Sequence, residues 1–330
     1  KAAVYYANRA FVNIKLENYG FAAEDATSAV NKDPKYPKGY YRRASAYFDM
    51  GKLKQAIANL KRVLELVPGD ADATEKLKIV QKVHKEKQLA EAISHDEDPL
   101  KDIAQDYKDM SVPDSYKGPA LEEDGPITPE FCIYLMDWMK DQKTMHKKHV
   151  WTLLFKVKEI LKKHKALVDL EIPADTEITV CGDTHGQYYD LLNIFKLNGN
   201  PSKENPYLFN GDFVDRGSFS VEVILCLLAW KAALPDHFHL TRGNHEAKSM
   251  NKLYGFEGEV NHKYDPKTYE IFCDVFCYLP LSYVINKKVM VVHGGLFSED
   301  GVKLDDLRSI NRIREPPEAG HMCEMLWSDP

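Results

Sequence analysis

The stretch that organises this chain reads Ile178-Thr179-Val180-Cys181-Gly182-Asp183-Thr184-His185-Gly186, an apolar run followed at once by a glycine-bordered polar cluster. The same device recurs three times before residue 296. The later apolar runs cover residues 207–210, 237–240 and 289–292, and the clusters that follow them are Gly211-Asp212-Phe213-Val214-Asp215-Arg216-Gly217, Arg242-Gly243-Asn244-His245-Glu246 and His293-Gly294-Gly295. Short apolar runs bounded by glycine and polar residues are typical of buried strands.

Helical patterns separate the first three runs, over residues 188–197 and 220–234. Strands that alternate with helices favour a shared sheet, so we expect these three strands to lie in one sheet. In open sheets of this type, ligands bind outside the carboxyl ends of the strands. We therefore expect the four polar clusters to converge on one site.

The polar clusters offer oxygen and imidazole donors without any thiolate, a mixture that suits manganese, iron or zinc. The candidate ligands are Asp183, His185, Asp212, Asn244 and His293. Four loops carry candidate ligands, which is more than one ion needs if it must keep one coordination position open for chemistry. The pattern therefore predicts two divalent metal ions. Ions in such sites lie roughly 3.5–4 Å apart and activate a bridging water. Asp212, from the central loop, is the predicted bridging ligand.

Three further residues suit phosphate hydrolysis. Arg216 can direct two N–H donors onto phosphate oxygens, and Asn244 is a second candidate for phosphate contact. His245 can protonate the leaving oxygen, and Asp215 is the candidate partner that fixes its tautomer. Because two divalent ions carry more charge than two ligand carboxylates neutralise, the site is predicted to favour a dianion.

These motifs together resemble the phosphoprotein phosphatase family of serine/threonine phosphatases, over roughly residues 120–330. The carrying motifs are Gly-Asp-x-His-Gly at 182–186, Gly-Asp-x-x-Asp-Arg-Gly at 211–217, Arg-Gly-Asn-His-Glu at 242–246, His293-Gly294-Gly295 and Leu326-Trp327-Ser328-Asp329-Pro330. The resemblance implies one-step hydrolysis of phosphoserine and phosphothreonine at a dinuclear metal centre. It also implies a further histidine ligand and a second phosphate-binding arginine, neither of which is found up to Pro330. We therefore expect a missing carboxyl-terminal part.

The amino-terminal segment repeats with a period of 34 residues. The pairs Tyr6 and Tyr40, Arg9 and Arg43, Ala10 and Ala44, Ala22 and Ala56, and Pro34 and Pro68 all have this separation. That period is typical of the tetratricopeptide repeat, an antiparallel helix pair. Repeats are predicted over residues 3–36 and 37–70, followed by a helix over 71–93. Because about three repeats make a stable stack, we expect a missing upstream repeat.

The repeat segment is basic, with 17 Lys and Arg against 10 Asp and Glu in residues 1–90, whereas the remainder is acidic. This asymmetry favours an acidic partner. The first helix of each pair lines the concave groove of such a stack, and these helices carry Asn8, Lys15, Lys38 and Arg42. The set resembles the carboxylate clamp with which some repeat domains hold the acidic carboxyl-terminal tails of cytosolic heat-shock chaperones. The alternative is a solvated basic face.

The predicted fold is therefore multi-domain, with an all-α tetratricopeptide-repeat superhelix over residues 1–93 and a metallophosphatase domain over 119–330. The second domain is of the α/β (α+β) class, with central β-sheets flanked by helices that include residues 129–139 and 148–165. Residues 94–118 are rich in acids, Pro and Ser without helical or alternating periodicity, which indicates an acidic linker.

The attached repeats resemble those of the group within this family that carries both parts on one polypeptide. That resemblance implies autoinhibition, in which the repeat domain covers the catalytic channel until an acidic chaperone tail or a fatty acid draws it away. Glu17, between two repeat helices, matches the autoinhibitory contact. It also implies phosphoprotein substrates and a cytoplasmic and nuclear location. We expect no nucleic-acid partner and no membrane span, since no apolar run approaches ~18–20 residues.

Two other functions compete with a protein phosphatase. The first is a dinuclear hydrolase of a small phosphoester such as a dinucleotide polyphosphate, because related hydrolases share the Asp-His, Asp and Asn-His cores. Asp215 and the attached repeats disfavour it. The second is a non-catalytic scaffold whose repeats bind chaperones, which the intact ligand set disfavours.

Overall fold

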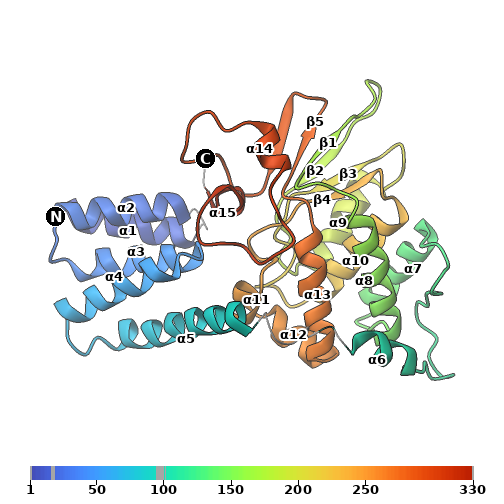
Figure 1. Cartoon of the computed structure of the whole chain (residues 1–330), viewed down its shortest axis with the longest axis horizontal. Coiled ribbons are helices and arrows are strands. Elements are labelled where there is room, and N and C mark those ends of the chain that lie inside the picture. The colour runs from blue at the N-terminus through green and yellow to red at the C-terminus, as the bar shows by residue number, and fades with distance from the viewer. Residues whose placement is uncertain (1, 16–18, 94–99, 101, 329–330) are drawn as a thin grey trace. The chain divides into compact units, whose positions relative to one another are not determined.

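The computed structural model describes residues 2–15, 19–93, 100 and 102–328. The chain divides into two compact units, Lys1–Glu97 with Trp327–Pro330 and Asp98–Leu326. The helices of the first unit run from blue to cyan in Figure 1, whereas the second unit combines helices with two small sheets.

The first unit consists of consecutive helices that pack in pairs. They are α1 (Ala2–Lys15), α2 (Tyr19–Lys32), α3 (Pro37–Asp49), α4 (Leu53–Leu66) and α5 (Ala71–Ile93). The repeat-related alanines Ala10, Ala22, Ala44 and Ala56 are fully buried, because small side chains let neighbouring helices approach closely. The pairs α1–α2 and α3–α4 correspond to the two predicted repeats, except that α1 begins at Ala2, one residue before the predicted start, and α5 has the bounds predicted for the following helix.

Three parallel strands of the second unit form the sheet that the sequence predicted. β2 (Thr179–Cys181), β3 (Tyr207–Phe209) and β4 (Phe238–Leu240) pair in that order, with α9 (Tyr188–Asn198) and α10 (Ser220–Ala233) between them in sequence. The shared sheet is therefore confirmed. The fourth strand, β6 (Val289–Val292), lies in a second sheet with β1 (Leu167–Leu170) and β5 (Ser282–Ile285). Asn286 and Lys287 form the turn between β5 and β6, both with the positive φ that tight hairpins require.

Helices flank these sheets and supply most of the core. α7 (Pro129–Lys140), α8 (Lys147–Leu161) and α13 (Pro266–Tyr278) pack with α10 in one hydrophobic cluster. Thr128 caps α7 by accepting a hydrogen bond from Phe131 N at 3.3 Å, as its sequence before Pro129 predicts. Apart from α6, which is described below, the remaining helices are short: α11 (Lys248–Tyr254), α12 (Phe256–Lys263), α14 (Leu304–Arg308) and α15 (His321–Trp327).

The structure corrects the predicted linker over residues 94–118. A helix, α6 (Ile103–Asp109), forms within it, and Ile103 is buried in the main core. Leu100, Tyr107 and Met110 pack against the same core. These four apolar residues recur at intervals of three and four, which is a helical period that the surrounding acids mask. Residues 94–99 and 101 lie outside the described residues.

Two further features of the structure concern membranes and thiols. Among the helices that the structure describes, none combines the length and the apolar character that crossing a membrane would need. All six cysteines are free thiols, and four of them are buried.

Candidate metal centre and active site

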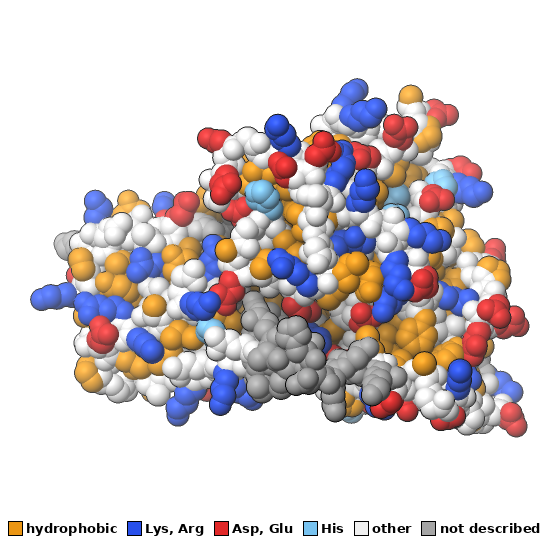
Figure 2. All heavy atoms as spheres, in the orientation of Figure 1, with side chains coloured by type: hydrophobic (Ala, Val, Ile, Leu, Met, Phe, Trp, Pro, Cys, Tyr) orange, Lys and Arg blue, Asp and Glu red, His pale blue; other side chains and the backbone are white. Residues whose placement is uncertain are grey.

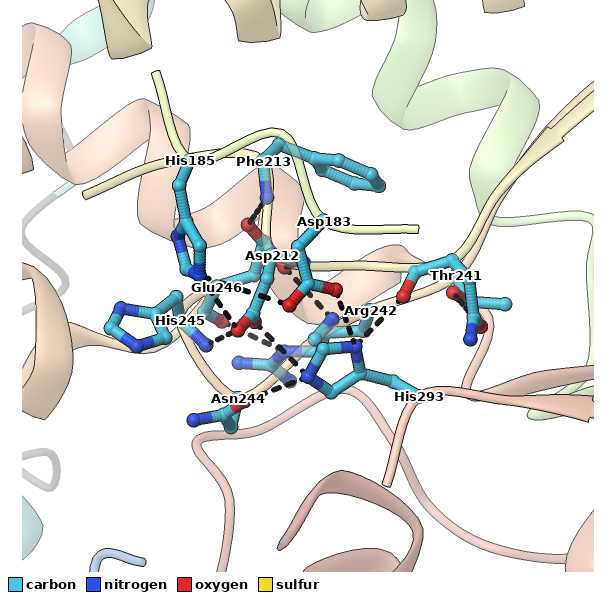
Figure 3. Close-up of polar contacts among 12 residues, drawn as sticks. Asp183, His185, Asp212, Phe213, Thr241, Arg242, Asn244, His245, Glu246 and His293 are labelled. Carbon is cyan, nitrogen blue, oxygen red and sulfur yellow. Dashed lines mark hydrogen bonds and ion pairs between the residues drawn. The ribbon is translucent and has the colours of Figure 1, made fainter. Parts of the chain in front are cut away.

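The strand ends bring the five predicted ligands together around Asp212 (Figure 3). Asp183 and His185 follow β2, Asp212 follows β3, Asn244 follows β4 and His293 follows β6. His185 Nε2 lies 3.4 Å from Asp212 Oδ2, and His293 Nε2 lies 3.3 Å from Asp212 Oδ1. Asp212 is 4% exposed, so its carboxylate is the buried centre of the cluster.

Two groups of potential metal ligands share this carboxylate. One joins Asp212 to Asp183 and His293, and the other joins it to His185 and His245, with the ligand atoms of each group within 4.8 Å of one another. Asp212 is therefore positioned between two candidate ion sites, where a bridging ligand would have to lie. His245, predicted to be an acid and not a ligand, lies close enough to belong to the second group.

Hydrogen bonds to carbonyl oxygens orient both candidate histidine ligands. His185 Nδ1 donates to Val214 O at 2.8 Å, and His293 Nδ1 donates to Asn210 O at 2.7 Å. A carbonyl oxygen can only accept, so Nδ1 carries a proton in each ring and Nε2 is the nitrogen that faces Asp212. A fixed tautomer of this kind is usual for histidines that bind metal.

Asn244 lies against the same carboxylate. Its side-chain amide lies 2.8 Å from His293 Nε2, and in the alternative orientation of the amide its NH₂ group would also donate to Asp212. The cluster therefore gathers carboxylate oxygens, imidazole nitrogens and an amide in one place, with no thiolate among them. Such a donor set fits a divalent metal ion such as manganese, iron or zinc.

The electrostatics of the cluster also favour bound positive charge. Burial and the nearby Asp212 carboxylate raise the pKa of Glu246 to about 7. Burial alone would lower the pKa of His293, but the carboxylates of Asp212 and Asp183 raise it to about 10. The Asp212 carboxylate contributes to the rise of both pKa values, so negative charge is concentrated in a buried space. Divalent cations would neutralise that charge.

Strained backbone is concentrated at these loops. Of the seven described non-glycine residues with positive φ, four lie here: His185, Asp212, Asp215 and Arg216, at 35°, 51°, 72° and 67°. Such conformations cost energy and persist where the surroundings enforce them, often at functional sites. Gly211 shows one source of the constraint, because a Cβ there would lie 2.6 Å from Gly243 Cα and 2.8 Å from His293 Nδ1.

Glu246 holds two ligand loops together from beneath. Its carboxylate accepts hydrogen bonds from the backbone N–H groups of Asp212, Phe213 and Gly243, at 2.9, 2.8 and 2.8 Å. No role for Glu246 was predicted from the sequence. Its signal was its place in the Arg-Gly-Asn-His-Glu cluster, but a cap between separate loops is visible only in the folded chain.

The predicted acid and its partner are in contact beside the cluster. His245 Nδ1 lies 2.8 Å from Asp215 Oδ2, and both side chains are fully buried. The carboxylate can only accept, so Nδ1 donates to it, while Nε2 accepts from Arg216 Nη2 at 3.1 Å. The three predicted residues therefore lie together, with Arg216 half-buried at the edge of the site.

Two residues around this pair were missed from the sequence. Asn251 Nδ2 donates to Asp215 Oδ2 at 3.1 Å and to His245 O at 2.6 Å. The ring of Tyr254 lies 5.1 Å from that of His245, and the Arg216 guanidinium lies 5.5 Å from the Tyr254 ring centroid. Both residues come from α11, whose sequence has no motif that marks a site.

The predicted clamp residues lie on two helices of the repeat unit. Asn8 and Lys15 are exposed on α1, and Lys38 is exposed on α3. Arg42, also on α3, is half-buried, with its guanidinium 3.9 Å from the Phe11 ring centroid. Glu17, the predicted autoinhibitory contact, lies outside the described residues.

Three families of known proteins match successive parts of the chain. The calcineurin-like phosphoesterase family matches residues 176–330, the tetratricopeptide repeat matches 37–70, and the PPP5 TPR repeat region matches 77–169. A serine/threonine-protein phosphatase 5 from Homo sapiens is 53% identical over 99% of this chain and 66% of its own length. A serine/threonine-protein phosphatase T from Trypanosoma brucei brucei is 48% identical over the whole chain and 69% of its own length.

A solved structure agrees with these sequence matches. It is a serine/threonine phosphatase from Saccharomyces cerevisiae with similarity to human phosphatase PP5, and it is 43% identical with a TM-score of 0.58. The superposition covers 59% of this chain and 62% of the yeast one. The chain thus spans about two thirds of the length of the relatives it matches.

Fold and site together define a metallophosphoesterase domain that shares its polypeptide with tetratricopeptide repeats. With 48% identity over 69% of a phosphatase T, the chain belongs to the family of serine/threonine-protein phosphatases that comprises phosphatase 5 and phosphatase T.

Proposed function

We propose that this protein hydrolyses phosphoserine and phosphothreonine in protein substrates. The observation that carries the proposal is the contact of Asp215, His245 and Arg216 beside the Asp212 cluster. A proton donor and a phosphate-binding cation are thereby fixed next to candidate metal ligands. Family membership supports the same reaction.

Asp183, His185, Asp212, Asn244 and His293 are the residues that would hold two divalent ions, for which manganese, iron and zinc suit the donor set. When bound, ions at such sites polarise a phosphoryl group and lower the pKa of water to near neutrality. Asp212, at 4% exposure, belongs to both groups of candidate ligands and is the residue that would be shared, whereas Asp183, with a side chain 48% exposed, belongs to one group only.

The remaining residues bind the phosphoryl group and move one proton. Arg216 directs its N–H groups onto phosphoryl oxygens and stabilises the charge that develops there. Protonated His245 donates from Nε2 to the serine or threonine oxygen as the phosphorus–oxygen bond breaks. Asp215 accepts from Nδ1 throughout, which keeps Nε2 directed at the leaving oxygen.

The two alternative functions are less well supported. A hydrolase of a dinucleotide polyphosphate would share the metal ligands, but the buried Asp215–His245 pair and the repeat unit favour a protein substrate. A non-catalytic scaffold would not require the strained loops that hold the candidate ligands together.

For the repeat unit, we propose capture of the acidic carboxyl-terminal tail of a cytosolic heat-shock chaperone by Asn8, Lys15, Lys38 and Arg42. The basic charge of the segment and the exposure of three of these side chains support it. If the tail is captured in this way, amidation of its terminal carboxylate should weaken binding. We further propose that this tail or a fatty acid relieves autoinhibition by the repeat unit. The protein is also proposed to reside in the cytoplasm and the nucleus.

Two substitutions test the catalytic proposal. Asp212→Asn should lower turnover of a phosphoserine peptide by several orders of magnitude and reduce bound metal, because both ion sites lose a shared carboxylate. His245→Gln should lower turnover by ~10²–10⁴-fold with metal content unchanged, since only the acid is removed. Turnover and elemental analysis after desalting measure both effects.

The matched control is His262→Gln, the same change at an exposed histidine, which should leave turnover within twofold. Loss of metal in His245→Gln would show that His245 is a ligand. Faster hydrolysis of a dinucleotide polyphosphate than of the phosphopeptide by the wild-type chain would favour the alternative enzyme.

A further inference from the structure

A row of cations separated by aromatic rings crosses the repeat unit. Lys15 Nζ and Arg42 Cζ lie 5.7 and 3.9 Å from the centroid of the Phe11 ring. Arg42 Cζ and Lys76 Nζ each lie 5.8 Å from the centroid of Tyr41. We call Lys15, Arg42 and Lys76 the cationic row. It extends from α1 across α3 to α5.

Lys76 occupies a position that the repeat period defines. Asn8, Arg42 and Lys76 are separated by 34 residues each, so they are equivalent positions on α1, α3 and α5. The start of α5 therefore acts as the first helix of a third unit, and it packs on α4 as α3 packs on α2. First helices line the groove of such stacks, which places Lys76 on the same side as the proposed clamp.

Among the described residues, carboxylates offset the charges of Arg42 and Lys76 only in part. Burial lowers the pKa of Arg42, and the groups that act on its charge in the opposite sense are the tyrosines Tyr41 and Tyr36, not carboxylates. Burial also lowers the pKa of Lys76, as do Arg42 and Lys15, and these effects outweigh Asp49. Partly desolvated cations held close together on rigid rings repel one another and attract anions.

On the face of the molecule drawn in Figure 2, blue Lys and Arg side chains lie among orange hydrophobic ones at the left, where Figure 1 places α1–α5. Aromatic rings hold the aliphatic stems in place and reduce the entropy lost on binding. The surface combines fixed positive charge with apolar walls. An acidic peptide in extended form would match both the positive charge and the apolar walls.

We propose that Lys76 is a peptide-binding residue that contacts an acidic side chain of the captured tail, while Arg42 and Lys38 hold its terminal carboxylate. The inference rests on the proposed tail capture and adds a binding position outside the two predicted repeats. The recognised ligand is thus an acidic peptide with at least one carboxylate before its terminal one.

The test uses the whole chain and a short fluorescein-labelled peptide of Glu, Ala and Asp residues with a free terminal carboxylate. Lys76→Ala should weaken binding by ~10-fold, the worth of one charge-assisted hydrogen bond. Lys76→Arg should retain most of the affinity, since it keeps the charge. Lys78→Ala, an exposed lysine two residues further along α5, is the matched control and should change affinity less than twofold.

A double-mutant cycle separates contact from structural damage. Replacing each internal Glu of the peptide by Gln should weaken binding to the wild-type chain, and one such replacement should have little further effect on Lys76→Ala. Additive losses at every position would overturn the assignment of Lys76, as would equal affinities for Lys76→Ala and Lys78→Ala. Equal affinity of the wild-type chain for the free and amidated peptides would instead overturn tail capture itself.

Discussion

A single buried amide connects the proposed acid to its partner. Asn251 donates to both Asp215 Oδ2 and the carbonyl oxygen of His245, and Phe256 N donates to Asp215 Oδ1 at 2.9 Å. Asp215 thus has defined donors on both oxygens, which fixes the plane of its carboxylate. The orientation of the His245 ring follows from that plane, so Asn251 acts as a positioning residue.

Asn251→Ala should lower kcat by ~10–100-fold with little change in KM, because the acid is misdirected while phosphate binding by Arg216 persists. Steady-state kinetics on a phosphoserine peptide measure both constants, and elemental analysis should show unchanged metal. The pH profile should also change on the limb that reports the acid, which a purely structural role would not alter.

The control for that substitution is Lys252→Ala, the next residue of α11, whose side chain is exposed. It should keep kcat within twofold of the wild-type value. If Asn251→Ala matched it in kcat and in pH profile, Asn251 would have no positioning role.

At the scale of elements, α10 depends on a cap from another helix. Its N-cap residue, Phe219, makes no side-chain cap, yet Ser220 N and Val221 N donate to Glu259 of α12 at 3.0 and 2.9 Å. Lys263 donates to both Glu259 and Glu222, at 2.6 to 2.8 Å. A carboxylate at the positive end of a buried helix stabilises it.

Glu259→Ala should lower the free energy of unfolding by about 2 kcal/mol, since two buried N–H groups lose a charged acceptor and Lys263 loses one partner. Urea denaturation followed by tryptophan fluorescence measures the change, helped by Trp230 within α10. Glu257→Ala, on the same helix, is the control and should shift the midpoint little. Equal midpoints for the two variants would contradict the capping role.

At the scale of the molecule, the two sheets of the second unit contact through buried side chains that include a histidine. His239 of β4 is 4% exposed, and its ring lies 5.2 Å from that of Tyr283 on β5. Burial, with Lys231 and His164 nearby, lowers the pKa of His239 to about 3. A positive charge on His239 would therefore destabilise the packing between the two sheets.

The sign of the pH dependence follows from that shift. Above about pH 6.5 neither the folded nor the unfolded chain protonates His239, and its neutral packing contributes fully to stability. As the pH falls from 6.5 towards 3, the unfolded chain binds a proton that the folded chain excludes, so stability is lost. The expected loss from this group is on the order of a few kcal/mol.

His239→Leu should therefore flatten the decline of unfolding free energy between pH 6.5 and pH 4 relative to the wild-type chain. Urea denaturation at a series of pH values gives the comparison. His262→Leu, at an exposed site, should leave the slope unchanged. Parallel slopes for all three proteins would mean that protonation of His239 does not govern acid stability.

The sequence by itself determined whatever depends on local order. Repeated strand-and-loop units predicted the sheet of three strands and the five candidate ligands, because backbone period and turn chemistry are set by neighbouring residues. The period of 34 defined the helix pairs for the same reason. The candidate acid His245, its partner Asp215 and the phosphate-binding Arg216 were likewise predicted from their motifs alone.

Only the tertiary structure decided the contacts between segments that are distant in sequence. Glu246 caps the loop of Asp212, Glu259 caps α10, and the start of α5 brings Lys76 beside Arg42. Each joins residues more than 30 positions apart, and many chain conformations satisfy the same local pattern. The helix at 103–109 was missed similarly, since Ile103 and Tyr107 within it, and Leu100 and Met110 beside it, gain stability from burial against the core and not from their own short segment. Local chemistry specifies which groups a site needs, but the packing of the core brings them within hydrogen-bond reach.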